Sequence, residues 1–583
     1  MMKIKNVLLM MTAAALLAGC NSIPNTGGAD LQLVDFGAVG DGKTDDIAAL
    51  VKALDALEAA GPGSTLHFEP GKVYKLGVRD DSVYQIDLQE LEGVTVNGHG
   101  SMLLVDPKQA YIRIRRCEGV TVKNFLLESD PLSYTQGKII ATNADKAWFD
   151  IELMEGYCDM PSDEMLATVR PFWPWGAVLD PAERRIRPAM TDHVYTERFE
   201  KIGESRYRMF TKPNYLEAIA QYRIGDVYFQ PLYWNSVERL EGLGMHVSYD
   251  ASANIIVSQS ADCEIENITM YSGRSAMTSR VEFNTGRITF DRFQVRHRPG
   301  FDERVVTNWR DGMHCKDNRV GPLIEDCYFE GMLDDSINIA SDTIMAVEQL
   351  SATTIRFCNW RGPLTWHRDI CAVKEGDQLM AYFPPTGEVQ GPYTIVKMDD
   401  EQPQIMTLDQ PIEGLVTGQV RSKVDVNATQ FYNLNAVNRG FIVRNNTFDK
   451  QRRDAMRTRG YDGLLEGNTV RNLAAEGIYL SNEMGNFYEG PFSQNVVIRN
   501  NHFSSMHGVI LKLISKTATS PLPLMKNIVV EGNTFESQVA KPVIVDNVAN
   551  VTFRNNRYID PSGQPLEEPI AAKHTSNLLI EDE

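Results

Sequence analysis

The protein has 583 residues, a length that exceeds one ordinary hydrophobic core and predicts several domains or a repeat architecture. Its composition, with 43% hydrophobic and 23% charged residues, is that of a folded chain. The formal net charge of −19 argues against nucleic acid or an anionic membrane surface as a partner of the folded part.

Residues 1–20 are typical of a lipoprotein signal peptide. Lys3 and Lys5 precede an apolar run over 7–18, which is too short to span a membrane as a mature helix. The run ends in Leu-Ala-Gly-Cys20, which is similar to the lipobox of bacterial lipoproteins. We therefore expect lipidation of Cys20. Such an anchor would make the protein a cell-envelope lipoprotein of a Gram-negative bacterium, held at the outer membrane.

Residues 21–137 are predicted to form an N-terminal cap and the first coils of a β-helix. The segment 35–46, DFGAVGDGKTDD, leads into apolar residues at helical spacing. Thr44 fits the N-cap of this helix, with Asp45 and Asp46 in its first turn. The segment resembles the opening of pectin-lyase-like β-helix proteins, whose first coil is closed by a short amphipathic helix.

Short strands that end at asparagine or glycine turns recur along the chain. The last apolar or aromatic residue of each C-terminal unit recurs at intervals of 22 to 33 residues, at Phe448, Val470, Phe503, Phe535 and Tyr558. Such self-similarity is typical of a solenoid whose stacked coils share one core. We therefore expect an all-β fold, a right-handed parallel β-helix of pectin-lyase type, with further coils over 238–340 and 430–583. Turn asparagines tolerate left-handed backbone and can form a ladder between coils.

Two stretches interrupt this repeat, 138–237 and 341–429. Each contains strand-length runs between Pro, Gly and Asp turns, and the two share a Gly-Asp phrase at Asp226 and Asp377. We predict that each stretch folds as a small antiparallel β-barrel inserted into the rod.

The strongest functional signal is a phrase that occurs twice, DGMHC from Asp311 and DSINI from Asp335. The spacing, 335 − 311 = 24, fits consecutive coils, whose strands lie ~4.8 Å apart in a parallel sheet. Asp311 and Asp335 would then be neighbours, with Asp334 beside them. Because three carboxylates this close cannot all ionise freely, one is expected to stay protonated next to a carboxylate base. Hydrolysis of a glycosidic bond needs such a pair, ~6.5 to 9.5 Å apart for inversion.

Strict alternation along the second phrase creates a difficulty. If Ile337 and Ile339 face the core, Asp335 faces it too, whereas Asp334 faces solvent. Both carboxyl groups reach one cleft only if the chain bends between them. Alternatively, these aspartates merely cap coil turns, where Asp is common. Three of them at matched spacing favour catalysis.

The coil alignment also predicts a binding wall. The outward positions of successive coils carry side chains that can hydrogen-bond sugar hydroxyl groups, namely His314, Asn338, Arg457 and Tyr479. We predict His314, Asn338 and Arg457 as substrate-binding residues. Trp309 could offer an apolar platform for a galactose-like ring.

The acidic phrases carry a family resemblance. Asp311-Gly312 and Asp334-Asp335 are similar to the Asn-x-Asp-Gly and Asp-Asp motifs of polygalacturonases, the family 28 glycoside hydrolases. In those enzymes the first aspartate of the pair is the acid, and the other two position water. The coils after Asp335 contain no Gly-His-Gly and no Arg-x-Lys, the motifs that grip a uronate carboxylate, which favours a neutral sugar.

The closer resemblance is to family 110 glycoside hydrolases, bacterial α-1,3-galactosidases that remove terminal galactose from blood group B-type and linear Gal-α-1,3-Gal structures with inversion. It covers most of the chain, including 35–46, the coils, both inserts and the two acidic phrases. The resemblance implies that Asp334 is the general acid and that Asp311 and Asp335 act on water. It implies no metal and no cofactor. The cysteines besides Cys20 show no paired spacing for disulfides or zinc.

Two other functional classes stay open. A calcium-dependent pectate lyase would need a carboxylate-lined metal site, which the three aspartates could form, and an arginine base, which the sequence does not place near them. A non-catalytic glycan-binding surface protein would use the rod alone. The leading interpretation predicts an oligosaccharide or glycoconjugate with terminal α-1,3-galactose as partner, and a homodimer stays open.

Overall fold

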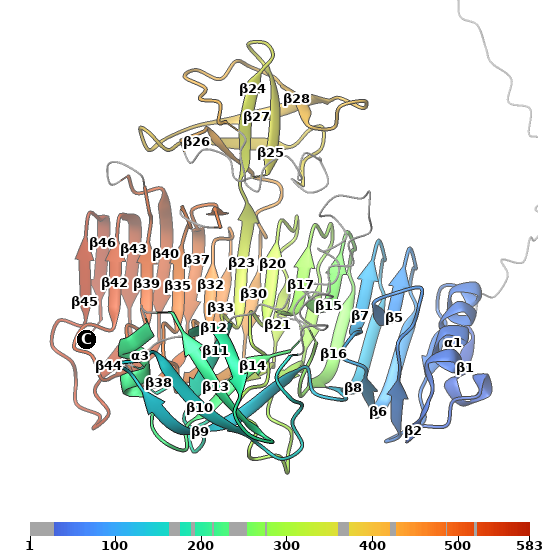
Figure 1. Cartoon of the computed structure of the whole chain (residues 1–583). Helices are drawn as coiled ribbons and strands as arrows, with labels where there is room; N and C mark the ends of the chain where they lie inside the picture. The colour runs from blue at the N-terminus through green and yellow to red at the C-terminus, as the bar shows by residue number, and fades with distance from the viewer. Residues whose placement is uncertain are drawn as a thin grey trace, which may run out of the picture.

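The computed structural model describes residues 28–161, 175–187, 190, 193–212, 215–232, 253–274, 277–359, 372–419, 427–484, 487–517 and 522–582. In these residues the chain forms a rod of stacked coils with one barrel along its side and a second barrel standing off its edge (Figure 1). Helix α1 and the C-terminal strands lie at opposite ends of the rod. The expected all-β parallel β-helix with two inserted antiparallel barrels is confirmed.

The N-terminal end of the rod is covered by a short 3-10 helix, η1 (Leu33–Phe36), and by helix α1 (Ile47–Ala60). Leu50, Ala53 and Leu57 of α1 are buried against the first coil. The prediction that Thr44 caps this helix is wrong, because the N-cap position belongs to Asp46. Thr44 lies in strand β2 (Asp41–Asp45) instead, where its backbone N–H donates to Asp41 Oδ1 at 2.7 Å.

Two parallel sheets build the coils in the described part of the chain. The sheet that carries the candidate site has 12 strands, of which β36 (Glu489–Gly490) pairs antiparallel with β23. Its parallel strands are β5 (Tyr84–Gln89), β7 (Ala110–Arg115), β15 (Ala253–Ser258), β17 (Met277–Glu282), β20 (Met313–Lys316), β23 (Ile337–Asp342), β32 (Met456–Thr458), β35 (Ile478–Ser481), β39 (Leu511–Ile514), β42 (Val543–Asp546) and β45 (Ile570–Lys573).

The other sheet has 22 described strands and forms the remaining faces of the rod. These strands are β1 (Asp30–Gln32), β2 (Asp41–Asp45), β3 (Thr65–His67), β4 (Val73–Leu76), β6 (Thr95–Val105), β8 (Thr121–Ser129), β16 (Glu264–Met270), β18 (Thr289–Asp291), β19 (Gln294–Val295), β21 (Leu323–Glu325), β22 (Tyr328–Glu330), β30 (Ile442–Arg444), β31 (Thr447–Asp449), β33 (Leu464–Glu466), β34 (Thr469–Arg471), β37 (Gln494–Arg499), β38 (His502–Met506), β40 (Met525–Glu531), β41 (Thr534–Ser537), β43 (Val548–Arg554), β44 (Arg557–Ile559) and β46 (Ser576–Glu581).

Stacking supplies the core, as the repeat predicts. One continuous apolar cluster runs through the coils, and equivalent aromatic residues stack on one another, as Phe329 does on Phe448 with ring centroids 5.3 Å apart. At the turns, a Gly or Asn in left-handed conformation precedes a buried asparagine whose side chain binds the next coil. Asn445, with a φ of 58°, and Gly467, with a φ of 64°, take this first position.

Each insert closes into a barrel of six described strands. The first comprises β9 (Tyr134–Asn143), β10 (Trp148–Leu153), β11 (Trp175–Leu179), β12 (Val194–Lys201), β13 (Arg206–Thr211) and β14 (Val227–Pro231), with the short helix α3 (Leu216–Gln221). The second comprises β24 (Ile344–Gln349), β25 (Thr354–Asn359), β26 (Gln378–Phe383), β27 (Glu388–Met398), β28 (Ile405–Leu408) and β29 (Gln430–Asn433). The insert limits 138–237 and 341–429 stay predictions.

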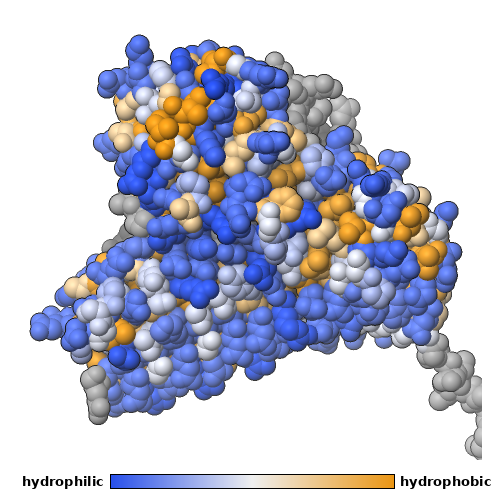
Figure 2. All heavy atoms as spheres, turned by 90° about the horizontal axis from the view of Figure 1, so that it is seen from below, coloured by the Kyte–Doolittle hydropathy of each residue, from blue (hydrophilic) through white to orange (hydrophobic). Residues whose placement is uncertain are grey.

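The surface agrees with the acidic, charge-rich composition. The face shown in Figure 2 is mainly hydrophilic, with apolar residues in separate patches. In the described residues, no helix has the length and apolar character needed to cross a membrane.

Candidate active site

The two acidic phrases lie side by side on neighbouring coils. Strands β20 and β23 pair in parallel with Met313 opposite Ile337, so Asp311 lies beside Asp335 just before each strand begins. The backbone N–H of Gly312 donates to the Asp335 carbonyl at 2.9 Å. Asp311, Asp334 and Asp335 each place one carboxyl oxygen within 4.8 Å of the others. The predicted spacing therefore brings all three aspartates into one cluster.

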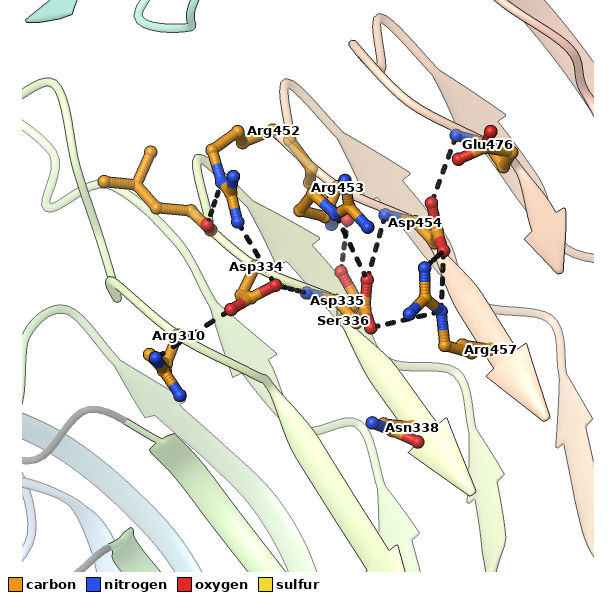
Figure 3. Close-up of polar contacts among 12 residues, drawn as sticks. Arg310, Asp334, Asp335, Ser336, Asn338, Arg452, Arg453, Asp454, Arg457 and Glu476 are labelled. Atoms are coloured by element: carbon orange, nitrogen blue, oxygen red, sulfur yellow. Dashed lines mark hydrogen bonds and ion pairs between the residues drawn. The ribbon is translucent and has the colours of Figure 1, made fainter. Parts of the chain in front are cut away.

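The chain bends where the mechanism requires it. Strand β23 begins only at Ile337, and the residues before it follow an irregular path instead of strict strand alternation. Asp334 lies between Arg310 and Arg452, and Asp335 lies beside Arg453 and Arg457 (Figure 3), while both keep a carboxyl oxygen within 4.8 Å of one of Asp311. Asp334 is the accessible member, with a side chain 25% exposed, whereas the Asp335 and Asp311 side chains are 6% and 10% exposed.

Burial keeps protons in this cluster. It raises the pKa of Asp335 to about 7, with Asp454 and Asp334 adding to the rise and Arg457 opposing it. Burial, followed by repulsion from Asp334 and Asp335, raises the pKa of Asp311 well above its usual range. Near neutral pH the cluster therefore contains both protonated and ionised carboxyl groups, which is what acid and base catalysis requires.

Four arginines surround the three aspartates. Arg452 Nη2 donates to Asp334 Oδ1 at 3.3 Å, and Arg310 Nε lies 3.9 Å from Asp334 Oδ2. Arg457 Nε lies 3.4 Å and Arg453 Nε 4.0 Å from the carboxyl oxygens of Asp335. The sequence alone assigned no arginine to this place, and the structure brings four there. Arg452 and Arg453 belong to the next coil, which the second barrel separates from Asp335 in the sequence.

A fourth acid extends the column. Asp454 follows Asp335 in register, and its backbone N–H donates to Asp335 Oδ1 at 3.3 Å. Its own carboxylate accepts hydrogen bonds from Arg457 at 2.6 and 2.9 Å. Burial raises the pKa of Asp454 to about 6. The coil alignment pairs Asp454 with Asp335, but sequence reasoning gave it no role.

The predicted binding wall lies in one column beside the acids. Register places His314 next to Asn338, Asn338 next to Arg457, and Arg457 next to Tyr479. His314 Nε2 lies 3.8 Å from Asp311 Oδ2, whereas the side-chain oxygen Oδ1 of Asn338 accepts a hydrogen bond from Arg459 Nη1 at 2.7 Å. Segment 487–490 covers this column, because β36 pairs with β23 there. Substrate binding by these residues stays a prediction.

Trp309 does not form the expected platform. It is only 1% exposed, and its ring packs at 6.1 Å between centroids against Trp175, the first residue of β11 in the first barrel. Both tryptophans belong to an apolar cluster that joins this barrel to the rod. The prediction that Trp309 offers an open face to a sugar is therefore wrong, because packing against the barrel uses that surface.

Sequence reasoning also missed two residues that reach the site from distant segments. Glu489 of β36 lies 3.4 Å from His314 Nε2. His193, the residue before β12, places its Nδ1 3.4 Å from Arg452 Nη1. The first barrel therefore adjoins the arginine that donates to Asp334. Neither residue lies in a repeat unit near the acidic phrases, so no spacing signal could have found them.

Two motifs of uronate-binding type occur away from the acids. Gly98-His99-Gly100 lies in β6, where His99 stacks on His67 with ring centroids 5.2 Å apart. The Arg-x-Lys sequence at 421–423 lies outside the described residues, as does the predicted lipidation site Cys20.

The only described group of three or more ligand-type side chains that could hold a metal ion is the triad Asp311, Asp334 and Asp335. Carboxylate oxygens suit a hard divalent cation such as calcium. Arg310, Arg452, Arg453 and Arg457 already place positive charge within 4.0 Å of these carboxylates, which opposes a bound cation.

Comparisons with known proteins agree with this picture. Residues 433–565 match the family model described as a right handed beta helix region. The chain is 22% identical to alpha-1,3-galactosidase B of Akkermansia muciniphila, over 95% of this chain and 69% of that protein. It is 23% identical to alpha-1,3-galactosidase B of Bacteroides thetaiotaomicron, over 97% of this chain and 92% of that protein.

The solved structures that match this chain include the family 28 exopolygalacturonase of Yersinia enterocolitica. The match has 10% identity, covers 95% of this chain and 79% of that chain, and has a TM-score of 0.38. The resemblance expected from the acidic phrases is confirmed: this chain is a right-handed β-helix protein, similar over nearly its whole length to curated α-1,3-galactosidases.

Proposed function

We propose that this protein is an exo-acting, inverting α-1,3-galactosidase. Its substrate would be a glycan or glycoconjugate with terminal α-1,3-linked galactose, either blood group B-type or linear Gal-α-1,3-Gal. The similarity to curated α-1,3-galactosidases over most of the chain supports a galactosidase. The observation that carries the proposal is the cluster of Asp311, Asp334 and Asp335, with carboxyl oxygens within 4.8 Å of one another.

The proposed role of Asp334 follows from its exposure. Asp334, the accessible carboxyl, gives a proton to the glycosidic oxygen as the bond from that oxygen to C1 breaks. Asp311 and Asp335 hold the water that attacks C1, and an ionised carboxylate of this pair takes its proton. Burial makes the pair share protons, so the proton taken from water can return to the acid for the next turnover.

Exo action agrees with how the site is enclosed. The first barrel approaches through His193, which contacts the Asp334 partner Arg452. On the other side, β36 covers the column that contains His314 and Asn338. A site closed on two sides fits the end of a glycan chain better than its middle.

Inversion is the part of the proposal that needs its own test. The nearest oxygens of the three carboxyl groups lie within 4.8 Å, which is shorter than the ~6.5 to 9.5 Å between carboxyl groups that is usual for inversion. Room for the water would then come from the side of Asp311 and Asp335 away from Asp334. Proton NMR of the first product formed identifies the anomer directly.

The activity is tested by incubating the protein with 4-nitrophenyl α-galactoside and with Gal-α-1,3-Gal, with and without chelator. We expect free galactose in both, at rates that chelator leaves unchanged. An unsaturated product from pectate, formed only with calcium, would overturn the proposal in favour of a lyase. Binding of the disaccharide without turnover would favour a glycan-binding protein.

We further propose that Cys20 carries a lipid anchor at the cell envelope. The lipobox-like sequence before it supports this. The test is metabolic labelling with a radioactive fatty acid in a bacterial host. Label and membrane association are expected in the wild type and absent in Cys20→Ser; a labelled Cys20→Ser variant would contradict the assignment.

A further inference from the structure

Glu489 enters the candidate site from outside the repeat. It belongs to β36, which pairs antiparallel with β23 opposite Asp342. Its side chain is 8% exposed and reaches residues of three consecutive coils. A carboxylate buried this deeply needs several partners to stay charged.

Both oxygens of Glu489 have such partners. Oε1 lies 3.1 Å from Lys316 Nζ and 3.4 Å from His314 Nε2. Oε2 lies 3.1 Å from Arg459 Nη1 and accepts a hydrogen bond from Asn338 Nδ2 at 3.4 Å. Although burial alone would raise it, Lys316 and Arg459 hold the pKa of Glu489 well below its usual range. Glu489 is therefore a fixed negative charge beside the binding wall.

This charge determines how His314 is protonated. Burial lowers the pKa of His314 to about 4, so the ring is neutral near pH 7 and has one N–H group. Nε2 faces carboxyl oxygens of Glu489 at 3.4 Å and Asp311 at 3.8 Å. The proton therefore lies on Nε2, and Nδ1 is a hydrogen-bond acceptor.

The acceptor on Nδ1 has no donor among the residues that the structure describes. His314 is 6% exposed, and its Nδ1 is buried without a hydrogen-bond partner among the described residues. An unpaired buried acceptor costs free energy, and because the ring lies beside the acidic cluster, with Nε2 3.8 Å from Asp311 Oδ2, a ligand at that cluster is the expected donor. The natural donor at a glycosidase site is a sugar hydroxyl group.

We propose that Glu489 is a positioning residue of the active site, which fixes His314 so that its Nδ1 accepts a hydrogen bond from one hydroxyl group of the bound galactose. This inference rests on the proposed galactosidase function and adds a specific recognition contact to it. Glu489 does not touch the sugar; it acts through His314.

The test compares kcat/KM on 4-nitrophenyl α-galactoside and on its 2-, 3-, 4- and 6-deoxy analogues. For wild type, kcat/KM is expected to be roughly tenfold lower on the one analogue that lacks the donor hydroxyl than on the parent galactoside. His314→Ala should have a lower kcat/KM than wild type on the parent galactoside. For this variant, kcat/KM on the analogue should equal that on the parent galactoside. Glu489→Gln should show the same reduced discrimination, because Nε2 then loses the carboxylate at 3.4 Å that holds its proton.

The control is Glu128→Gln. Glu128 is 2% exposed and pairs with Arg298 and Arg304 on the 22-stranded sheet, so it matches Glu489 in burial and charge but lies outside the site. This variant should reproduce the wild-type pattern on all analogues. Thermal unfolding of every variant confirms that each is folded, and His314→Ala alone tests the contact if Glu489→Gln does not fold.

A pH profile supplies a second readout. The negative charge of Glu489 is one of the causes that raise the pKa of Asp311. Glu489 itself directly contacts Lys316, His314, Asn338 and Arg459. In Glu489→Gln the pKa of Asp311 falls, and because Asp311 and Asp335 titrate as one interacting cluster, the basic limb of kcat/KM should move to lower pH.

An active wild type combined with a Glu489→Gln variant of unchanged analogue pattern and unchanged pH profile would overturn this inference and leave the proposed function standing. A wild type without galactosidase activity would overturn both.

Discussion

A column of buried asparagines and a column of buried aspartates run along the described part of this rod. In the C-terminal coils, Asn446, Asn468, Asn501, Asn533 and Asn556 form a ladder in which each backbone N–H donates to the next side-chain oxygen at 2.9 to 3.0 Å. In the site coils, Asp311, Asp335 and Asp454 follow one another in similar register. An amide offers both a donor and an acceptor, so the asparagines satisfy one another, whereas the carboxylates repel.

The difference separates a stabilising column from a functional one on the same scaffold. The asparagines of the ladder satisfy one another without charge from coil to coil, and the last of them, Asn556, donates to Asp582 Oδ1 at 3.0 Å. The aspartate column keeps protons at neutral pH only because burial and like charge raise its pKa values. Stability is lost there so that acid and base groups can coexist.

The largest expected effect comes from changing the acid itself. Asp334→Asn removes the proposed proton donor and should lower kcat on Gal-α-1,3-Gal by roughly 10³-fold. Because the Asp334 side chain is 25% exposed, its melting temperature should stay close to that of wild type. Full activity in this variant, measured by galactose release, would show that the proposed acid is wrong.

The next largest effect is on stability. It is expected when an asparagine of the ladder is replaced by aspartate. Asn468→Asp removes the amide that donates to Asn501 at 2.9 Å and to the Val443 carbonyl at 3.0 Å. We expect a loss of about 2 to 4 kcal/mol in the free energy of unfolding at pH 8. Activity of the folded protein should be unchanged. Urea unfolding measures the loss, and an unchanged midpoint would contradict the ladder account.

The reverse exchange should stabilise the protein. Asp335 has a pKa of about 7 in the folded protein, above the unfolded value of ~3.9, so the folded state binds more protons between these values. The stabilising contribution of protonated Asp335 is therefore present below pH ~4 and is lost as pH rises through about 7. Asp335→Asn should be more stable than wild type by about 1 to 3 kcal/mol at pH 8, while losing activity.

The same comparison across pH provides the control. The gain from Asp335→Asn should shrink towards zero by pH 4, where wild-type Asp335 is protonated throughout. A gain that is equal at pH 4 and pH 8 would mean that charge in the column is not its cause.

A smaller effect is expected on the pH dependence of activity. Because the cluster needs a proton, kcat/KM on 4-nitrophenyl α-galactoside should fall roughly tenfold per unit above the pKa of about 7. Asp454→Asn removes a charge that raises the pKa of Asp335, so it should move this basic limb to lower pH. A limb that does not move would remove Asp454 from the proton-sharing column.

The smallest effect is expected from chelator. With Arg310, Arg452, Arg453 and Arg457 around the triad, the carboxylates have their positive partners already. Galactose release in excess chelator should equal that without it. Loss of activity, restored by added calcium, would place a metal ion among the aspartates.

Sequence periodicity predicts the rod because side-chain alternation and turn asparagines are local signals. The doubled phrase predicts the pairing of Asp311 with Asp335, since coil spacing sets the register. The bend before Ile337 cannot be predicted this way, because it depends on how the turn packs. Trp309 was misjudged for a similar reason: its partner Trp175 belongs to an inserted barrel more than a hundred positions away. Glu489 arrives by antiparallel pairing, which no coil repeat encodes.

The most direct test of the central claim is proton NMR of Gal-α-1,3-Gal during hydrolysis by wild type and by Asp334→Asn. We predict that β-galactose appears first with wild type, before mutarotation, and that the variant releases almost none over the same time. Release of α-galactose first would contradict inversion. Absence of galactose from the wild-type reaction, or equal release by the two proteins, would contradict the assignment of the acidic cluster as a galactosidase site.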